Sequence, residues 1–179
     1  MVRTQSILPL SASDMADLLV DSSKVQIYNK MSLGREDIRI FTKDTKIVCN
    51  LTKPPVAKSR MVSVTFMHKE ELLPPQNSHD PRPSYLVVTR AVPSLVDPSL
   101  SDLPRNDILL GINLLEPVPG GNDDACQMTA ITHVYSPALP MILAKSMGVS
   151  SAVNFVKDIR KSCAVTPRIE DAKTVVESR

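Results

Sequence analysis

The chain has little aromatic character: its 179 residues include three Phe, three Tyr and no Trp. Nucleic-acid modules that stack bases need exposed aromatic rings, so this scarcity argues against a base-stacking binder. The net charge of +2 gives no strong attraction to nucleic acid or to an anionic membrane. No apolar run reaches the ~20 residues that a membrane span requires. What remains is a single globular domain with enough residues for a real core.

Signals for a leader segment or for disulfides are also weak. The three cysteines, Cys49, Cys126 and Cys163, form no CxxC pair and are odd in number. We therefore expect three reduced thiols that behave as small apolar side chains. The first ten residues hold only a very short apolar run, so no signal peptide is expected. Together these features predict a cytoplasmic protein.

The motifs of enzymes and of metal sites are missing. His68, His79 and His133 have no metal-ligand spacing to one another or to the cysteines. There is no GxSxG elbow and no Cys-His signature. The Gly120-Gly121 pair lacks the Lys-Ser/Thr of a phosphate-binding loop, so it indicates a hairpin turn. We expect neither catalysis nor a metal or cofactor.

The patterns that are present predict strands around one short helix. Ser11 and Ser13 are candidate N-caps for an amphipathic helix over Asp14–Val20. Alternating residues bounded by turn signals predict seven strands: Val2–Leu10, Ile38–Phe41, Lys46–Thr52, Met61–His68, Tyr85–Val92, Ile108–Val118 and Cys126–Tyr135. Because turns and loops join consecutive strands, an antiparallel meander is expected.

A long amphipathic helix is expected from Ser136 to Ala164. Ser136 is a suitable N-cap, and Pro137 suits the first helical position. The apolar face of this helix is wider than a narrow stripe, so it contacts more than one surface. Packing against a core explains such a face, and so does the lining of a cavity. Residues 165–179 are charged and weakly patterned, which predicts a flexible tail.

Several short sequences occur in an order that matches a known family. They are Leu18-Leu19-Val20-Asp21 at a helix end, Lys58 to Val64 at a strand start, Leu110 to Pro117 in a Gly-containing strand that ends in Pro, and Tyr135 to Pro140 before the long helix. In this order the chain resembles the START (StAR-related lipid transfer) family from about Met1 to Ala164. It departs from the family in lacking Trp, and in having Met61 after Arg60 where the family has an Arg-Asp pair.

The resemblance implies an α+β helix-grip fold of the START/Bet v1 type, in which an antiparallel sheet wraps around the long C-terminal helix. Residues 1–164 would form a lipid-binding domain with a hydrophobic tunnel for one phospholipid, sterol or ceramide. The lipid would be transferred at a transient membrane contact or sensed, without a cofactor. The loop Pro93–Arg105 would belong to the lid.

The family carries a helix and two strands before the point matched by Met1. We therefore expect a shortened sheet with an open edge, where a partner chain could pair. The alternative is a degenerate interaction module that keeps the fold without an enclosed ligand.

The resemblance also suggests a lipid site. Its expected residues are Leu139, Ile142, Leu143 and Met147 on the helix, Ile112 and Leu114 on the sheet, and Asn50, Thr65 and Arg90 as candidates for the head group. Thr65 falls where sterol-binding members place an Arg, and Asn50 falls near its carboxylate partner, so neutral groups replace an ion pair there. Arg90 shares a strand face with Leu86 and Val88, and an outward position on a solvated face is its competing interpretation.

Overall fold

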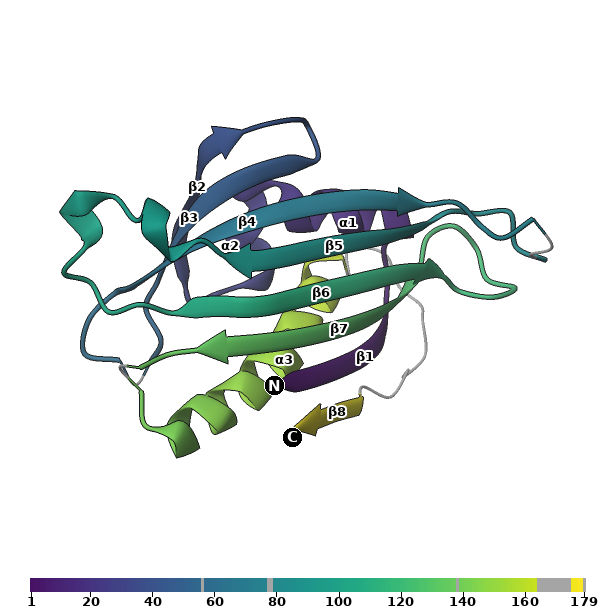
Figure 1. Cartoon of the computed structure of the whole chain (residues 1–179). Helices are drawn as coiled ribbons and strands as arrows, with labels where there is room; N and C mark the ends of the chain where they lie inside the picture. The colour runs from purple at the N-terminus through teal and green to yellow at the C-terminus, as the bar shows by residue number, and fades with distance from the viewer. Residues whose placement is uncertain (56, 77–78, 138, 164–174, 179) are drawn as a thin grey trace.

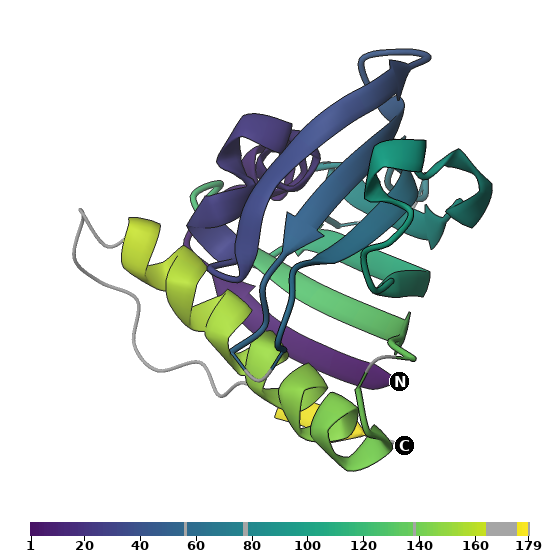
Figure 2. The same ribbon diagram turned by 90° about the vertical axis from the view of Figure 1, so that its left-hand side faces the viewer.

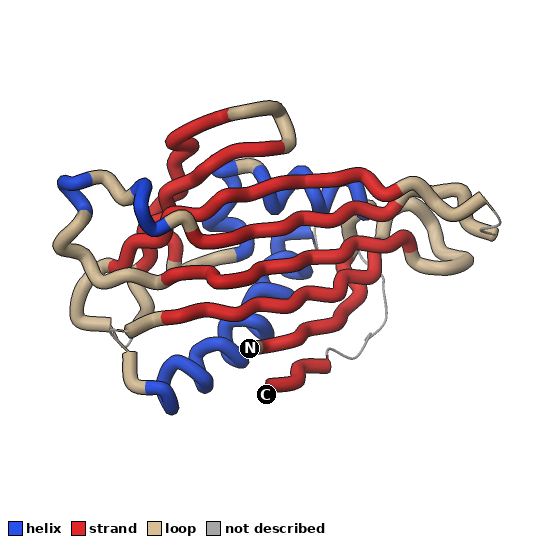
Figure 3. The backbone as a smooth tube through the Cα atoms, viewed as in Figure 1, coloured by secondary structure: helices blue, strands red, loops and turns tan. Residues whose placement is uncertain are grey.

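The protein is built on one eight-stranded antiparallel sheet with the strand order β2-β3-β4-β5-β6-β7-β1-β8 (Figures 1 and 3). The computed structural model describes residues 1–55, 57–76, 79–137, 139–163 and 175–178, and the side chains of all of these except 141, 143, 144 and 175–178. The strands are β1 Val2–Leu8, β2 Ser32–Ile40, β3 Thr45–Thr52, β4 Met61–Leu72, β5 Ser84–Ala91, β6 Asp107–Pro117, β7 Cys126–Tyr135 and β8 Val175–Ser178. Strands β2 to β7 follow chain order, so the predicted meander is confirmed.

The helices lie together on one side of the sheet (Figure 2). They are α1 Ala12–Val20, α2 Val25–Tyr28 and α3 Met141–Cys163, and the short 3-10 turns are η1 Ser22–Lys24, η2 Pro93–Leu95 and η3 Pro98–Leu100. Helix α1 packs over β4 to β7, whereas α3 packs over β1 and against α2. Ser11 caps α1 as predicted, because its hydroxyl accepts a 2.9 Å hydrogen bond from the amide of Asp14.

The strand register defines which side chains face these helices. Lys69 of β4 forms an ion pair with Asp17 of α1 at 2.6 Å, which places Lys69 on the helix side. The row that Lys69 begins crosses the sheet through Val87, Asn113, Ala130 and Thr4. Because side chains alternate along a strand, the even-numbered residues of β1, β3 and β7 and the odd-numbered residues of β4 and β5 share this side. We call it the inner face.

The hydrophobic core occupies one end of the inner face. It joins side chains of five strands to α1, α2 and the second half of α3, and its members with 0% exposure are Leu8, Met15, Ala16, Leu115, Cys126, Met128 and Ile159. Each large side chain buried in this way stabilises the fold by about 1.5–3 kcal/mol. Phe155 of α3 also contacts Tyr28 edge-on, with ring centroids 5.5 Å apart. Among the described side chains, none from the first half of α3 (residues 141–151) belongs to this core.

Two boundaries differ from the sequence-based expectation. Helix α3 begins at Met141, directly after Pro140, and not at Ser136. The Ser136 hydroxyl donates to the side-chain oxygen of Asn106 instead of capping a helix. Strand β2 begins at Ser32, six residues before the predicted Ile38, because pairing with β3 extends back to Thr52.

The sheet edge beside β1 is occupied by the chain itself. Strand β8 pairs antiparallel with β1, from Val2 opposite Ser178 to Gln5 opposite Val175. The expected flexible tail over 165–179 is therefore wrong for Val175–Ser178, and the rest of that segment lies outside the described residues. The edge expected to stand open is paired along part of its length.

The loop between β5 and β6 lies along the start of β4. The amide of Val62 donates to Pro104 at 2.9 Å, the amide of Asn106 donates to Val62 at 3.0 Å, and the amide of Val92 donates to Val64 at 2.9 Å. These backbone bonds fix the two ends of the segment Pro93–Arg105 beside the start of β4. Its role as part of a lid stays a prediction.

Candidate functional site

A group of small polar side chains interrupts the inner face outside the core. It consists of Ser32 of β2, Asn50 and Thr52 of β3, and Ser63 and Thr65 of β4, and we call it the polar row. Ser32, Thr52, Ser63 and Thr65 are each 5% exposed or less, and Asn50 is half-buried. Burying hydroxyl groups is unfavourable unless they find partners, so their position indicates a purpose other than filling space.

Most of the polar row is satisfied internally. The Ser32 hydroxyl donates to Oδ1 of Asn50 at 2.7 Å. The hydroxyls of Ser63 and Thr65 lie 3.1 Å apart. The Oγ1 atom of Thr52 is buried and has no hydrogen-bond partner among the described residues. One hydrogen-bonding position is therefore left open within the sheet.

Two apolar residues complete this part of the inner face. Val48 and Met61 are 2% and 1% exposed, yet neither belongs to the core that α1 and the second half of α3 enclose. Apolar side chains with a few polar groups are the usual lining of a small-molecule site.

Half-buried apolar residues lie in the first half of α3 and just before it. They are Met147 and Val149 in the helix and Leu139 before it. The helix passes close to β1 here, because a Cβ on Gly148 would lie 3.2 Å from Cγ2 of Val2. Of the predicted site residues, Leu139 and Met147 are therefore half-buried, and the side chain of Leu143 lies outside the described part of the chain.

Four of the predicted site residues are placed differently. Ile142 is 84% exposed, so it does not line an enclosed space. Arg90 pairs with Phe66 on the outer face and is exposed, so its competing interpretation is the correct one. Ile112 and Leu114 pair with Val88 and Leu86 on that same outer face. Successive side chains of a strand point to opposite faces, and these three residues each lie one position from an inner-face residue. Their side chains therefore point away from the helices.

Asn50 and Thr65 do share the inner face on adjacent strands, as expected. Asn50 pairs with Ser63, and Thr65 pairs with Val48. The sequence analysis missed Thr52 and Ser63, although each lies two positions from a residue that it named. A strict period of two along β3 and β4 would have found both of them.

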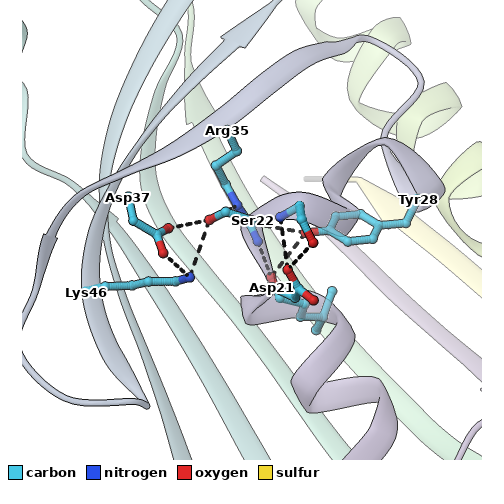
Figure 4. A network of polar contacts seen from close by, with 8 residues as sticks. Asp21, Ser22, Tyr28, Arg35, Asp37 and Lys46 are labelled. Atoms are coloured by element: carbon cyan, nitrogen blue, oxygen red, sulfur yellow. Dashed lines mark hydrogen bonds and ion pairs between the residues drawn. The ribbon is translucent and has the colours of Figure 1, made fainter.

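A network of charges fixes β2 and β3 to the segment after α1 (Figure 4). Arg35 donates to the carbonyl of Leu19 at 3.0 Å, to the hydroxyl of Tyr28 at 2.9 Å and to the hydroxyl of Ser22 at 3.1 Å. Burial raises the pKa of Tyr28, so its hydroxyl stays protonated and donates to the same Leu19 carbonyl. Because Arg35 is half-buried, these bonds to a charged group stabilise the junction by about 1.5–3 kcal/mol each at most.

The second charged pair of this network joins β2 to β3. Lys46 lies 3.0 Å from Asp37, and Ser22 donates to the other oxygen of the same carboxylate. Burial raises the pKa of Asp37, but the hydrogen bonds from Ser22 and Lys46 outweigh it, and the net shift is downward. The Asp37 carboxylate is therefore matched by Lys46, whereas the Arg35 guanidinium donates to neutral oxygens.

The described residues contain neither a cluster of metal ligands nor a membrane-spanning helix. No three His, Cys, Asp or Glu side chains there are grouped to hold a metal ion. No helix in that part of the chain has both the length and the apolar character to cross a membrane.

Comparison with known proteins identifies the fold. No family model matches the sequence, and no curated protein matches it either. Among solved structures, human StAR-related lipid transfer protein 5 superposes with a TM-score of 0.73, at 16% identity, over 91% of this chain and 75% of that one. Human STARD10 gives 0.70 at 16% identity, over 90% of this chain and 62% of that one.

A third structure widens the comparison. The Zhui aromatase/cyclase from Streptomyces sp. R1128 gives a TM-score of 0.60 at 9% identity, over 92% of this chain and 94% of that one. This chain spans less than two thirds of the STARD10 chain. The chain therefore has the START-like helix-grip fold that its sequence predicted.

Proposed function

We propose that this domain binds one lipid molecule between the inner face of the sheet and the first half of α3. The observation that carries the proposal is the division of α3. Its second half is sealed into the core through Val156 and Ile159, at 1% and 0% exposure. Its first half carries Met147 and Val149, which lie outside that core and on the same side of the sheet as the polar row.

The likeness to START-like structures supports the same proposal. A lipid site needs an apolar enclosure and a few polar groups that orient the head of the ligand. Val48 and Met61 supply buried apolar surface, and the polar row supplies hydroxyls and an amide. Binding and release involve no chemical step in this proposal, so the domain acts as a carrier or sensor and not as an enzyme.

A transient membrane contact belongs to the proposal as well. Ile142 is 84% exposed at the start of α3, and Lys145 is exposed one turn later. The connection from β3 to β4 reaches the same end of the molecule (Figure 1) and carries the exposed cations Lys53, Lys58 and Arg60. An apolar side chain surrounded by cations suits the surface of an anionic bilayer.

A cytoplasmic location is consistent with the thiols. Cys49, Cys126 and Cys163 are all free in the structure. Unpaired thiols persist in a reducing compartment. We therefore propose that the lipid is exchanged at membrane surfaces that face the cytoplasm.

The test is mass spectrometry of the purified chain under native conditions, followed by extraction and identification of anything bound. One lipid per protein molecule is the expected result. A protein that is empty and also fails to take up lipid from vesicles of mixed phospholipid, sterol and ceramide would refute the proposal. The interaction module without a ligand would then be the better description.

A pair of variants separates lipid binding from stability. Met147→Gln places an amide on the half-buried side of α3, and Ser146→Gln places the same group at an exposed neighbour. We expect Met147→Gln to reduce lipid uptake with a stability loss of about 1 kcal/mol or less, because only part of the side chain is buried. Ser146→Gln should match wild type in both measurements. Equal uptake by both variants would exclude the first half of α3 from the site.

A further inference from the structure

We infer that the ligand is an uncharged lipid with a small oxygen head, either a hydroxyl or an ester carbonyl, and that the Thr52 hydroxyl bonds this head. The inference rests on the proposed function, because it names the class of lipid for the same site. Its basis is the combination of an unpaired buried hydroxyl with nearby cations that already bond protein groups: Arg35 bonds three neutral oxygens, and Lys46 and Lys69 bond carboxylates.

Thr52 is placed by its strand partners. It lies opposite Ser32 of β2 and Met61 of β4, one inner-face position beyond Asn50. Its side chain is 5% exposed, and its Oγ1 atom has no partner among the described residues. Neighbouring inner-face hydroxyls avoid this condition by pairing with each other, as Ser63 and Thr65 do at 3.1 Å. A buried hydroxyl without a partner is rare in native proteins and calls for an explanation.

The cations on this part of the inner face already bond protein groups. Arg35 donates to Leu19, Tyr28 and Ser22, as described above. Lys46 forms an ion pair with Asp37 at 3.0 Å. A phosphate placed here would compete with the partners of these two cations.

The third half-buried cation of the inner face is also matched. Lys69 lies 2.6 Å from Asp17 and 3.0 Å from Asp44. Burial lowers the pKa of Lys69, but these two carboxylates outweigh it and raise the pKa, which keeps the ammonium charged and bound to them. An anionic head group would have to break such pairs or remain buried without a counter-charge, which is far more costly than burying a neutral head.

The remaining hydrogen-bonding capacity suits a neutral oxygen. The Thr52 hydroxyl can donate or accept. Ser32 takes one of the two lone pairs on Oδ1 of Asn50, so the amide of Asn50 can still donate through its NH₂ group and accept one further bond. A ligand hydroxyl can donate to Thr52 and accept from Asn50, and an ester carbonyl can accept from either of them. A sterol, a long-chain alcohol and a monoacylglycerol all present such a head.

The decisive probes are two lipids that differ only by one phosphate group. Monooleoylglycerol and oleoyl lysophosphatidate share one acyl chain and one glycerol unit, and only the second carries a phosphate. The full chain is incubated with vesicles that contain equal amounts of both, and the bound lipid is counted by native mass spectrometry. We expect monooleoylglycerol to exceed lysophosphatidate by at least about tenfold. Equal occupancy, or an excess of lysophosphatidate, would overturn the inference.

Variants at Thr52 test the hydroxyl itself. Thr52→Val keeps the shape of the side chain and removes the oxygen, whereas Thr52→Ser keeps the oxygen. Loss of one hydrogen bond should weaken monooleoylglycerol binding about 2- to 10-fold in Thr52→Val. Thr52→Ser should stay within about twofold of wild type on the same scale. Unchanged binding in Thr52→Val would remove Thr52 from the site.

Thermal unfolding of the ligand-free variants excludes a purely structural effect. Replacing an unsatisfied buried hydroxyl with an apolar group of the same shape is neutral or stabilising, so Thr52→Val should unfold at the same temperature as wild type or higher. A lower unfolding temperature together with weaker binding would assign Thr52 a structural role and overturn the inference. A protein that binds neither probe nor any lipid from an extract refutes the proposed function itself. A protein that binds lysophosphatidate well refutes only the choice of a neutral head.

Discussion

The tightest contact on the inner face yields a prediction of defined size. Gly111 of β6 lies opposite Thr89 of β5. A Cβ added to Gly111 would lie 2.1 Å from Oγ1 of Thr89 and 3.4 Å from Cγ2 of Ile108. Since non-bonded carbon atoms prefer separations of about 3.5–4.0 Å, Gly111→Ala must move Thr89 by more than about 1 Å. Overpacking of this kind costs about 1–3 kcal/mol.

The clash depends on a single atom, so a second substitution should relieve it. In Gly111→Ala/Thr89→Ala the Oγ1 atom is gone, and the nearest remaining atom of residue 89 is its Cβ, at the ordinary distance of 3.5 Å. We expect a coupling energy of about 1–3 kcal/mol between the two sites. The matched control is Thr89→Ser, which keeps Oγ1 and should give no relief.

Urea unfolding followed by far-ultraviolet circular dichroism measures these energies in a chain without Trp. If the two alanine substitutions are additive within about 0.5 kcal/mol, the contact does not exist. The register that places Gly111 opposite Thr89 would then be wrong. The pairing of Ile112 with Val88 would be wrong with it, because both pairs belong to the same register.

Two further predictions concern ionisable groups. Burial raises the pKa of the Cys126 thiol to about 12. Iodoacetamide at pH 8 should therefore leave Cys126 unmodified in the native protein, as measured by peptide mass spectrometry. Alkylation of Cys126 at the rate seen in the unfolded chain would contradict this. Burial raises the pKa of Asp37, but the hydrogen bonds from Ser22 and Lys46 outweigh it and lower the pKa overall. The contribution of Asp37 to the free energy of unfolding is therefore present above the unfolded pKa of about 3.9 and is lost as pH falls through the lower folded pKa. Asp37→Asn should therefore be less stable than wild type at pH 6 and lose less stability between pH 6 and pH 3, and parallel pH profiles would refute this.

The strands were predictable because their signals are local. Alternating residues and turn residues placed β3, β4, β5, β6 and β7 within a few positions of their observed bounds, apart from the longer C-terminal end of β4. The closing helix was predictable from its periodicity, but its first turn was not. Ser136-Pro137 is a good local start, yet the Ser136 hydroxyl bonds Asn106, which lies thirty positions earlier in the chain. A long-range contact of this kind leaves no local signal.

The direction of the strand faces was harder to predict than the strands themselves. In β4 the alternation sets Val62 and Val64 against Ser63 and Thr65, and the simplest interpretation puts the valines toward the helices. The structure does the opposite. Both sets are buried, because the loop after β5 covers the start of β4 and protects the valines. When both faces of a strand are covered, hydrophobicity no longer distinguishes them.

The same ambiguity explains the misplaced sheet residues of the candidate site. In β6 the outer Ile112 and Leu114 are as apolar as the inner Leu115, so the alternation of residue types does not show which set faces the helices. The polar row was half predictable: Asn50 and Thr65 were found through the family resemblance, which compares residues by position. Thr52 shares the face of Asn50 by the period of two along β3, but its missing hydrogen bond is visible only in the structure.

The position of β1 affects how the protein is made. Val2 has Thr132 as its neighbour on one side and Ser178 on the other. During synthesis the first strand therefore has no sheet partner until β7 begins at Cys126, more than 110 residues after β1 ends at Leu8, and its second partner β8 follows later still. The meander from β2 to β7 can form while the chain is still growing, because each of its strands follows its neighbour in sequence. Closure around β1 waits for β7 and β8, and contacts between such distant residues make a fold slow to complete.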